Sequence, residues 1–231
     1  MASSLLFVHS PLVGPSSWAR VAKVARDARG GRVTVPDLTG IASMRQEWTD
    51  WYVTAAARAA TPRSGEVVVV GHSGAGVFLP AIAAELGARA TIFVDAVVPP
   101  GDGPHHTSPA LAELLDRQTD AGLLRPWLDW WPDDVVERLL PDGADRAALR
   151  ADMPRLPRAF YDEPVAVPDG WTDRPNCYVQ LSPAYDDDRR RAHEWGWPVS
   201  AFDGTHLSVI TDPGRVFAAI VDVVEQIARP T

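Results

Sequence analysis

Four consecutive valines, Val67 to Val70, restrict the possible folds of this chain more than any other feature of the sequence. A continuous β-branched run is typical of a strand that is buried on both faces, as in the centre of a parallel sheet. We therefore predict a strand over Glu66–Val70. Further short apolar runs predict strands at Leu5–Val8, Arg32–Val35, Ala90–Val94, Cys177–Leu181 and, more weakly, Pro198–Phe202.

Helical patterns alternate with these strands. Apolar residues recur at helical spacing from Trp18 to Ala28, where Gly30-Gly31 is expected to end the helix, and again from Val216 to Ile227. Alternating strands and helices are typical of βαβ units. The sequence thus predicts an α/β fold with a mainly parallel sheet of roughly six strands and helices on both faces.

The alternation stops between residues 99 and 171. This segment is rich in Pro and Trp, and its helical stretches, Pro109–Leu124 and Asp133–Leu140, have no strand between them. We predict a helical cap at 99–171, inserted into a core formed by 1–98 and 172–231. Its tryptophans Trp127, Trp130 and Trp131 either join the cap to the core or line an apolar substrate pocket.

Charge and cysteine content exclude several classes of function. The 231 residues include 22 Lys+Arg against 30 Asp+Glu, a formal charge of −8, and no basic stripe is present. We therefore expect neither nucleic acid nor an anionic membrane as a partner. The expected partner is a small-molecule substrate. The single cysteine, Cys177, cannot form an internal disulfide, and the apolar run from Leu5 to Val8 is too short for a signal or membrane segment. We expect a cytoplasmic protein.

The segment that follows the valine run reads Gly-His-Ser-Gly-Ala-Gly and leads into an apolar stretch, Val77–Leu86, that is expected to be helical. The pattern G-x-S-x-G around Ser73 is that of a nucleophile elbow, a sharp strand-to-helix turn that needs small neighbours, and here Ala75 replaces the last glycine. We predict Ser73 as a nucleophile and the N–H of Gly74, at a helix N-terminus, as an oxyanion donor. Pro80 is expected to kink the helix.

A serine hydroxyl needs a neighbouring base to act as a nucleophile. His206 is the candidate, because it follows the last predicted strand and the chain order Ser then His fits. His72 is held inside the elbow, and His9, at the end of the first strand, is expected to shape the loop there and to border the substrate. The remaining histidines are expected in solvent: His105, His106 and His193. Their spacing predicts no metal site, and no cofactor is predicted.

These residues resemble the α/β-hydrolase superfamily over almost the whole chain, and in particular its small-esterase branch of plant hydroxynitrile lyases and salicylate esterases. The resemblance is carried by the elbow and by three further segments, Phe7-Val8-His9-Ser10-Pro11 through Trp18, Val35-Pro36-Asp37-Leu38-Thr39-Gly40, and Gly204-Thr205-His206 followed by Asp212-Pro213. It implies an acid that orients the histidine.

Two places in the sequence offer that acid. In most of the superfamily it follows the penultimate strand, which points to Asp186–Asp188, but these aspartates also begin a helical stretch with arginines three or four residues on, which explains them structurally. Asp95 closes a buried apolar run, where a charge needs a partner, and the segment 93–99 resembles the strand end that carries the acid in one group of haloalkane dehalogenases. We predict Asp95, with Asp186 and Asp187 as alternatives.

The second oxyanion donor departs from the resembling esterases. There it is the backbone N–H two residues after the strand-end histidine, which is Pro11 in this sequence, and proline has no N–H. Either Leu12 supplies it through a shifted loop, or the hydroxyl of Ser10 does, or the hole has one donor only. Loss of a donor costs on the order of a hundred- to a thousandfold in rate.

Three functions follow from this set of residues. The first is a serine hydrolase that cleaves an ester, thioester or lactone of a small, fairly apolar substrate. The second is a lyase, isomerase or cyclase on the same scaffold, in which Ser73 and His206 act as acid and base; Pro11 and the hydroxynitrile lyase resemblance favour it. The third is a ligand-binding protein, against which the complete set of catalytic residue types argues.

Overall fold

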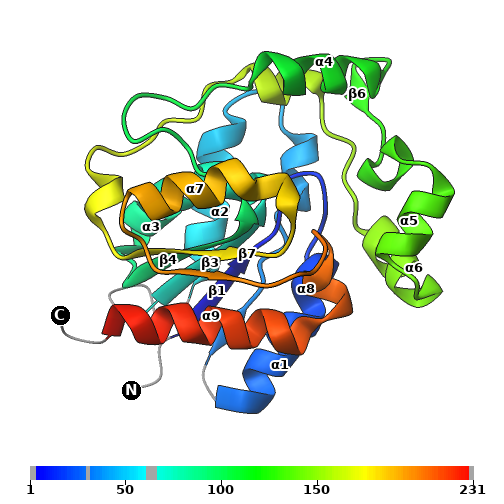
Figure 1. Cartoon of the computed structure of the whole chain (residues 1–231). Helices are drawn as coiled ribbons and strands as arrows, with labels where there is room; N and C mark the ends of the chain where they lie inside the picture. The colour runs from blue at the N-terminus through cyan, green and yellow to red at the C-terminus, as the bar shows by residue number, and fades with distance from the viewer. Residues whose placement is uncertain (1–3, 30–31, 61–66, 229–231) are drawn as a thin grey trace.

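The computed structural model describes residues 4–29, 32–60 and 67–228, and a six-stranded parallel sheet forms its centre (Figure 1). In spatial order the strands are β2 (Val33–Thr34), β1 (Ser4–Val8), β3 (Val67–Ser73), β4 (Ala90–Ala96), β7 (Asn176–Gln180) and β8 (Val199–Ala201). The predicted α/β fold with a six-stranded sheet is confirmed. The predicted strand start at Glu66 and helix stop at Gly30-Gly31 lie outside the described residues.

The sheet is covered on both faces (Figure 1). One face packs against α2 (Trp48–Ala59), α3 (Leu79–Leu86) and α7 (Asp186–Glu194), and the other against α1 (Ser16–Arg29), α8 (Ser208–Thr211) and α9 (Pro213–Ala228). Side chains alternate between the faces of a strand, so Val67 and Val69 of β3 join the first cluster while Val68 and Val70 join the second. Burial of one valine side chain contributes about 1.5–3 kcal/mol, which is why a run of four valines belongs at the centre of a doubly covered sheet.

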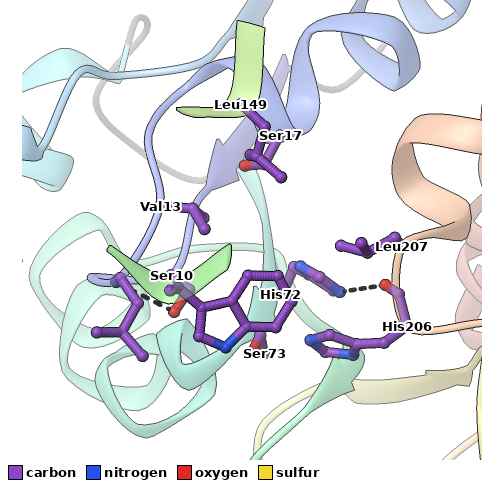
Figure 2. Close-up of a pocket in the computed structure, with 10 residues that line it drawn as sticks. Ser10, Val13, Ser17, His72, Ser73, Leu149, His206 and Leu207 are labelled. Carbon is purple, nitrogen blue, oxygen red and sulfur yellow. Dashed lines mark hydrogen bonds between the residues drawn. The ribbon is translucent and has the colours of Figure 1, made fainter. Parts of the chain in front are cut away.

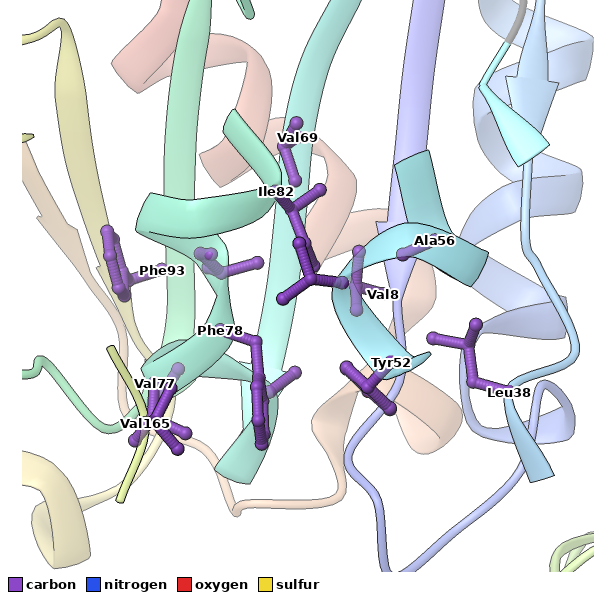
Figure 3. Packing of buried hydrophobic residues seen from close by; sticks show 14 of the residues in the cluster. Val8, Leu38, Tyr52, Ala56, Val69, Val77, Phe78, Ile82, Phe93 and Val165 are labelled. Carbon is purple, nitrogen blue, oxygen red and sulfur yellow. The ribbon is translucent and has the colours of Figure 1, made fainter. Parts of the chain in front are cut away.

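Aromatic and aliphatic side chains close the first of these faces. Figure 3 shows Tyr52 and Ala56 of α2 and Ile82 of α3 packed over Val8 and Val69 of the sheet. Val165, which belongs to the insertion described next, is part of the same cluster. The apolar core of the sheet therefore continues into the segment that lies above its carboxyl edge.

The segment between β4 and β7 carries short elements of its own and lies along the edge of the sheet in Figure 1. Its elements are α4 (Pro109–Arg117), β5 (Thr119–Asp120), β6 (Leu123–Leu124), η3 (Trp127–Trp130), α5 (Asp133–Leu139), α6 (Gly143–Ala151), η4 (Arg158–Asp162) and η5 (Trp171–Asp173). The two short strands pair with each other and not with the central sheet. The range 99–171 predicted for a cap falls within this segment.

The helix predicted over Pro109–Leu124 is too long, and its last residues form a hairpin instead. The helix ends at Arg117, and β5 and β6 pair antiparallel across Ala121 and Gly122. Both turn residues have positive φ, 48° and 79°. A two-residue turn of this kind favours a hairpin over a continued helix, and the apolar spacing in the sequence did not reveal it.

The kink predicted at Pro80 is also wrong. The residues after Ser73 first form a 3-10 turn, η2 (Gly74–Phe78), and α3 begins only at Leu79. Pro80 consequently lies in the first turn of α3, where a backbone N–H has no partner inside the helix and a proline removes no hydrogen bond.

Two carboxylates from the insertion cap the N-termini of two core helices. Asp152 accepts hydrogen bonds from the backbone N–H and the hydroxyl of Ser16 at the start of α1, both at 2.8 Å. Glu163 accepts from the backbone N–H of Trp48 and Thr49 at the start of α2, at 3.3 and 2.9 Å. Negative charge at a helix N-terminus satisfies free N–H groups and interacts favourably with the helix dipole. These contacts attach the insertion to the core at two places.

Within the described residues, no helix combines the length and the apolar character that a membrane crossing requires.

A close backbone approach explains one glycine of the elbow. A Cβ at Gly76 would lie 2.0 Å from the carbonyl oxygen of Val97, where the chain leaves β4. We expect Gly76→Ala to lower the free energy of unfolding by about 1–3 kcal/mol, because the backbone must move to admit the methyl group. Gly214→Ala is the control: a Cβ there meets no atom within 4 Å, and alanine favours the helix. Urea unfolding measures both, and a Gly76→Ala variant as stable as the wild type would contradict the close approach.

Candidate active site

Ser73 lies at the turn between β3 and η2. Its backbone has φ 59° and ψ −130°, a conformation that is rare for residues with a Cβ. Small neighbours make room for the turn: a Cβ at Gly71 would lie 2.5 Å from the side chain of Leu79, and Ala75 is fully buried. The order strand, sharp turn and helix is the one that a nucleophile elbow requires.

Asp95 is the bulged residue of β4. The pairing with β3 changes from His72–Val94 to Ser73–Ala96, so that Asp95 has no opposite residue, and its φ is 42°. A bulge changes the direction of a side chain at the end of a strand. Here the carboxylate oxygen Oδ2 accepts a hydrogen bond from Nδ1–H of His206 at 2.8 Å.

The Asp95 carboxylate is fully buried and has a complete set of donors. Its Oδ1 accepts from the backbone N–H of Leu181 at 2.9 Å and of Ser182 at 3.0 Å, and its Oδ2 also accepts from the Ser182 hydroxyl at 2.6 Å. Burial by itself raises the pKa of Asp95, but the hydrogen bond and charge of His206, and the bonds from Ser182 and Leu181, outweigh burial and lower the pKa. Asp95 is therefore ionised at neutral pH.

The imidazole of His206 is held on several sides. Because Nδ1 donates to Asp95, the other nitrogen, Nε2, is left to accept a proton. The ring stacks against those of His72 and Tyr185, with centroids 4.3 and 5.1 Å away. The Nε2–H of His72 donates to the carbonyl oxygen of His206 at 3.0 Å (Figure 2). Burial and the neighbouring His206 lower the pKa of His72 to about 3, which keeps His72 neutral.

The hydroxyl of Ser73 faces a tyrosine. Ser73 Oγ lies 3.2 Å from the hydroxyl of Tyr185, at hydrogen-bond distance. Among the residues that the structure describes, this is the hydroxyl's one hydrogen bond, and none joins it to His206. Ser73 and His206 nevertheless line the same pocket.

The loop after β1 lies against the residue that follows the serine. A Cβ on Gly74 would be 3.1 Å from Oγ of Ser10 and 3.8 Å from Cδ of Pro11. The backbone N–H of Leu12 donates to Ser10 Oγ at 3.5 Å, a long hydrogen bond that directs this N–H toward Ser10. The hydrogen of the Ser10 hydroxyl remains available as a donor.

A pocket opens beside Ser73 and His206. Figure 2 shows Ser10, His72, Ser73 and His206 around it, with Leu207 from the loop before α8. We call it the serine pocket. Trp127 of η3 also lines it, with its ring edge-on to His206 at 6.2 Å between centroids.

The other predicted substrate-binding residues lie elsewhere. The indole N–H of Trp130 donates to the Arg125 carbonyl at 2.9 Å and its ring packs against the core, while Trp131 is 40% exposed. His9 is fully buried: its Nδ1–H donates to the Ser10 carbonyl, and its Nε2 accepts from the Leu38 N–H. Of these predicted residues, Trp127 therefore lines the serine pocket. Trp130 joins the insertion to the core, and His9 lies beneath the loop that follows β1.

A second pocket is lined by Gly74 and Pro11 on one side. The rest of its wall is mainly apolar. Phe78 of η2 contributes to it, and the insertion contributes Leu111, Phe160, Tyr161 and Val165. His105 lines it too, although its polar neighbours predicted a solvent position. A backbone bridge to Val165, with hydrogen bonds of 2.9 and 3.0 Å, holds His105 half-buried, and burial, with His106 and Arg191, lowers its pKa. His106 and His193 are exposed.

The alternative acids have structural partners in the first turn of α7. Asp186 accepts a hydrogen bond from the side-chain amide of Gln180 at 2.5 Å, and Asp187 pairs with Arg190 at 2.8 Å on the surface. Asp188 accepts from the backbone N–H of Val98 at 2.7 Å. Among the described residues none of the three contacts His206.

Metal ligands do not gather at this site. In the part of the chain that the structure describes, no three His, Cys, Asp or Glu side chains lie close enough together to hold a metal ion. Cys177 is buried on β7, where its thiol donates to the Val223 carbonyl at 3.4 Å and burial raises its pKa to about 12. The reactive polar groups near the serine pocket are therefore those described above.

Four contacts at the site were not predicted from the sequence. They are the hydrogen bond of Tyr185 to Ser73, the stacking of His72 on His206, and the two bonds of Ser182 to Asp95. A partial signal was present, because Ser182 and Tyr185 follow the strand predicted at Cys177–Leu181. Loops at the carboxyl ends of parallel strands are where functional side chains meet.

Comparisons with known proteins agree on one scaffold. A family model described as "Alpha/beta hydrolase family" matches residues 5–220. Among solved structures, the chain is similar to a pyrethroid hydrolase from Sphingobium faniae JZ-2 (TM-score 0.72, 18% identity, 97% of this chain and 98% of that chain covered). It is also similar to a methylesterase from Arabidopsis (0.69, 18%, 96% and 99%) and to polyneuridine aldehyde esterase (0.66, 13%, 97% and 100%). At these identities the similarity shows the fold alone, and no curated protein matches the sequence significantly.

The neutral state of His72 has a consequence for stability. Its pKa falls from the ordinary value of 6.5 to about 3 on folding, so the unfolded chain binds an additional proton between these values. Above pH 6.5 the protonation of His72 does not lower the free energy of unfolding. Below that value, proton binding to His72 in the unfolded chain lowers the free energy of unfolding by about 1.4 kcal/mol per pH unit.

We expect His72→Gln, which keeps a side-chain N–H but cannot titrate, to reduce the slope of unfolding free energy against pH by about that amount between pH 6.5 and 4.5. Urea unfolding at intervals of one pH unit measures the slope. His9, also buried with a lowered pKa, is present in both proteins, so its contribution cancels. Parallel curves for the two proteins would contradict the buried neutral state of His72.

Proposed function

The chain belongs to the alpha/beta hydrolase family and is an enzyme of hydrolase type, and from this premise we propose that it cleaves an ester, thioester or lactone bond through Ser73, His206 and Asp95. Family membership confirms the resemblance read from the sequence motifs. The observation that carries the proposal is the 2.8 Å hydrogen bond from His206 to the buried carboxylate of Asp95, at the same pocket as the elbow serine.

The proposed mechanism uses the Ser73 hydroxyl and the Nε2 atom of His206. The Ser73 hydroxyl turns from Tyr185 to Nε2 of His206, which takes its proton as Oγ attacks the carbonyl carbon. The imidazolium that forms is stabilised by the ionised Asp95. His206 then gives the proton to the leaving group, and in the second half of the reaction it activates a water molecule that hydrolyses the acyl-enzyme.

Two donors are available for the developing oxyanion. The N–H of Gly74 at the start of η2 is the first, and we assign the second to the hydroxyl of Ser10, which lies near Gly74 and whose hydrogen is free. Leu12 is the weaker alternative, because its N–H is directed at Ser10. A side-chain donor at this place makes up for the N–H that Pro11 lacks.

The pockets support a small and fairly apolar substrate. Neighbouring residues of the loop and the elbow line the two pockets, Ser10 and Ser73 in the serine pocket and Pro11 and Gly74 in the second. Trp127 adds an apolar wall to the first pocket, and Phe78 and Phe160 add one to the second. We propose that the insertion at 99–171 acts as the cap over them. The names of the structural neighbours, a pyrethroid hydrolase and a methylesterase, agree with ester substrates. The cytoplasm is the proposed compartment.

A non-hydrolytic reaction is the second candidate. Pro11 in the oxyanion loop favours it, because a lyase or isomerase that uses Ser73 and His206 as acid and base needs no tetrahedral oxyanion. A ligand-binding protein with little turnover is the third. Formation of an acyl-enzyme or an equivalent adduct on Ser73 separates the first candidate from the other two.

The direct test is intact mass after exposure to a fluorophosphonate, which reacts with activated serines and needs no knowledge of the substrate. We expect one adduct on the wild-type protein and none on Ser73→Ala, because Ser73 is the proposed nucleophile. His206→Ala should reduce labelling strongly while the fold persists. A folded wild-type protein without an adduct, or a Ser73→Ala variant that is still labelled, would contradict the proposal.

The choice of acid has its own test. Asp95→Asn should lower turnover by about 10⁴-fold, because the imidazole loses the carboxylate that fixes its tautomer and stabilises its charge. Asp187→Asn is the matched control, since Asp187 is an exposed aspartate paired with Arg190, and its turnover should stay within about twofold of the wild type. Steady-state hydrolysis of an activated ester measures both. The reverse ranking would move the acid to the loop after β7.

A further inference from the structure

The hydroxyl of Tyr185 touches a reacting atom. It lies 3.2 Å from Oγ of Ser73, and the tyrosine ring stacks on the imidazole of His206 at an interplanar angle of 14°. Tyr185 ends η6 (Pro183–Tyr185), the turn that joins β7 to α7. A loop at the carboxyl edge of the sheet therefore places a phenol beside both the proposed nucleophile and the proposed base.

This phenol stays protonated under all ordinary conditions. Burial raises the pKa of Tyr185 well above its ordinary value; the hydrogen bond with Ser73 lowers it in part, and the nearby carboxylates of Asp95 and Asp188 raise it further. A phenol that does not ionise is a hydrogen-bond donor as well as an acceptor. Proton uptake or release by Tyr185 is therefore no part of its role.

The location of Tyr185 determines to which substrate oxygen its hydroxyl can donate a hydrogen bond. In the proposed mechanism His206 passes its proton to the leaving oxygen, so that oxygen must come within hydrogen-bond distance of Nε2. The stacked ring of Tyr185 lies next to the same imidazole, and its hydroxyl is already at Ser73 Oγ. The carbonyl oxygen has its own proposed donors in Gly74 and Ser10.

We propose that Tyr185 is a further catalytic residue, which donates a hydrogen bond to the departing ester oxygen in both halves of the reaction. The role rests on the serine mechanism proposed above. In acylation, the bond between the carbonyl carbon and the leaving oxygen breaks, the proton comes from His206, and Tyr185 shares its hydrogen with the oxygen on which negative charge develops. In deacylation, the bond between the carbonyl carbon and Oγ of Ser73 breaks, His206 returns its proton to Oγ, and Tyr185, which contacts Oγ before the reaction, donates to it again as it departs. Tyr185 keeps its proton throughout.

A donor at the departing oxygen favours one class of substrate. Alkoxides are poor leaving groups and develop much charge that a hydrogen bond can stabilise, whereas nitrophenolate leaves easily and needs little help. The structure thus points to esters of ordinary aliphatic alcohols as the substrates for which Tyr185 matters most.

The test is the dependence of kcat/KM on the leaving group for Tyr185→Phe. We expect the variant to hydrolyse ethyl butyrate about tenfold more slowly than the wild type, the effect of one neutral hydrogen bond, and 4-nitrophenyl butyrate within about twofold. Across a series of alkyl and substituted phenyl butyrates, a plot of log kcat/KM against the pKa of the leaving alcohol should become steeper.

Tyr178→Phe is the matched control. It removes a second phenol hydroxyl from the same region. Tyr178 is fully buried, and its hydroxyl bonds to the backbone of Ala96 at 2.9 and 3.1 Å and touches no reacting atom. A purely structural disturbance should lower the rates of all the esters by one common factor, without a change of slope.

Two results would overturn the inference. A common factor across the whole series for Tyr185→Phe would reduce Tyr185 to a structural role, and a rise in all the rates would mean that it merely holds Ser73 away from His206. Failure of the serine mechanism is a different result, because then the wild-type enzyme itself would show no Ser73-dependent hydrolysis of any ester and no fluorophosphonate adduct.

Discussion

The buried carboxylate of Asp95 is the interaction on which the arrangement of the site depends. A charge without solvent needs hydrogen bonds from its surroundings, and Asp95 receives them from the exit of β7, through Leu181 and Ser182, and from the loop that carries His206. One side chain thereby joins β4, β7 and the loop before α8. Loss of its charge would leave all three without their common partner, so the carboxylate orders the carboxyl edge of the sheet as well as the imidazole.

The insertion is attached to the carboxyl edge of the sheet by both polar and apolar contacts. Its half-buried carboxylates, Asp152 and Glu163, cap α1 and α2, and its apolar residues Phe160 and Val165 continue the core. Each cap is worth about 1 kcal/mol, so these contacts help to hold the insertion in place. The second pocket lies where Gly74 and Pro11 of the core face this insertion, and its shape follows from these attachments.

Local patterns in the sequence predicted what depends on local physics. Buried strands, the elbow around Ser73 and the loop position of His206 could be read from residue type and order, and Asp95 from the cost of a charge at the end of an apolar strand. The hairpin after Arg117, the half-buried position of His105 and the contact of Tyr185 with Ser73 depend on turn geometry or on residues far apart in the chain. Periodicity carries no information on such contacts.

Two of the four non-glycine residues with positive φ in the described part of the chain are the proposed nucleophile and acid. Ser73 and Asp95 both have positive φ, and they belong to neighbouring strands at the one place where the pairing of β3 and β4 shifts its register. Such conformations cost of order 1–3 kcal/mol each and persist only where the surrounding structure holds them. Before the shift, β3 pairs in continuous register with β4 and β1 through its buried valines. The regular half of the sheet therefore stabilises its irregular edge, and the same bulge that strains the backbone directs Asp95 toward His206.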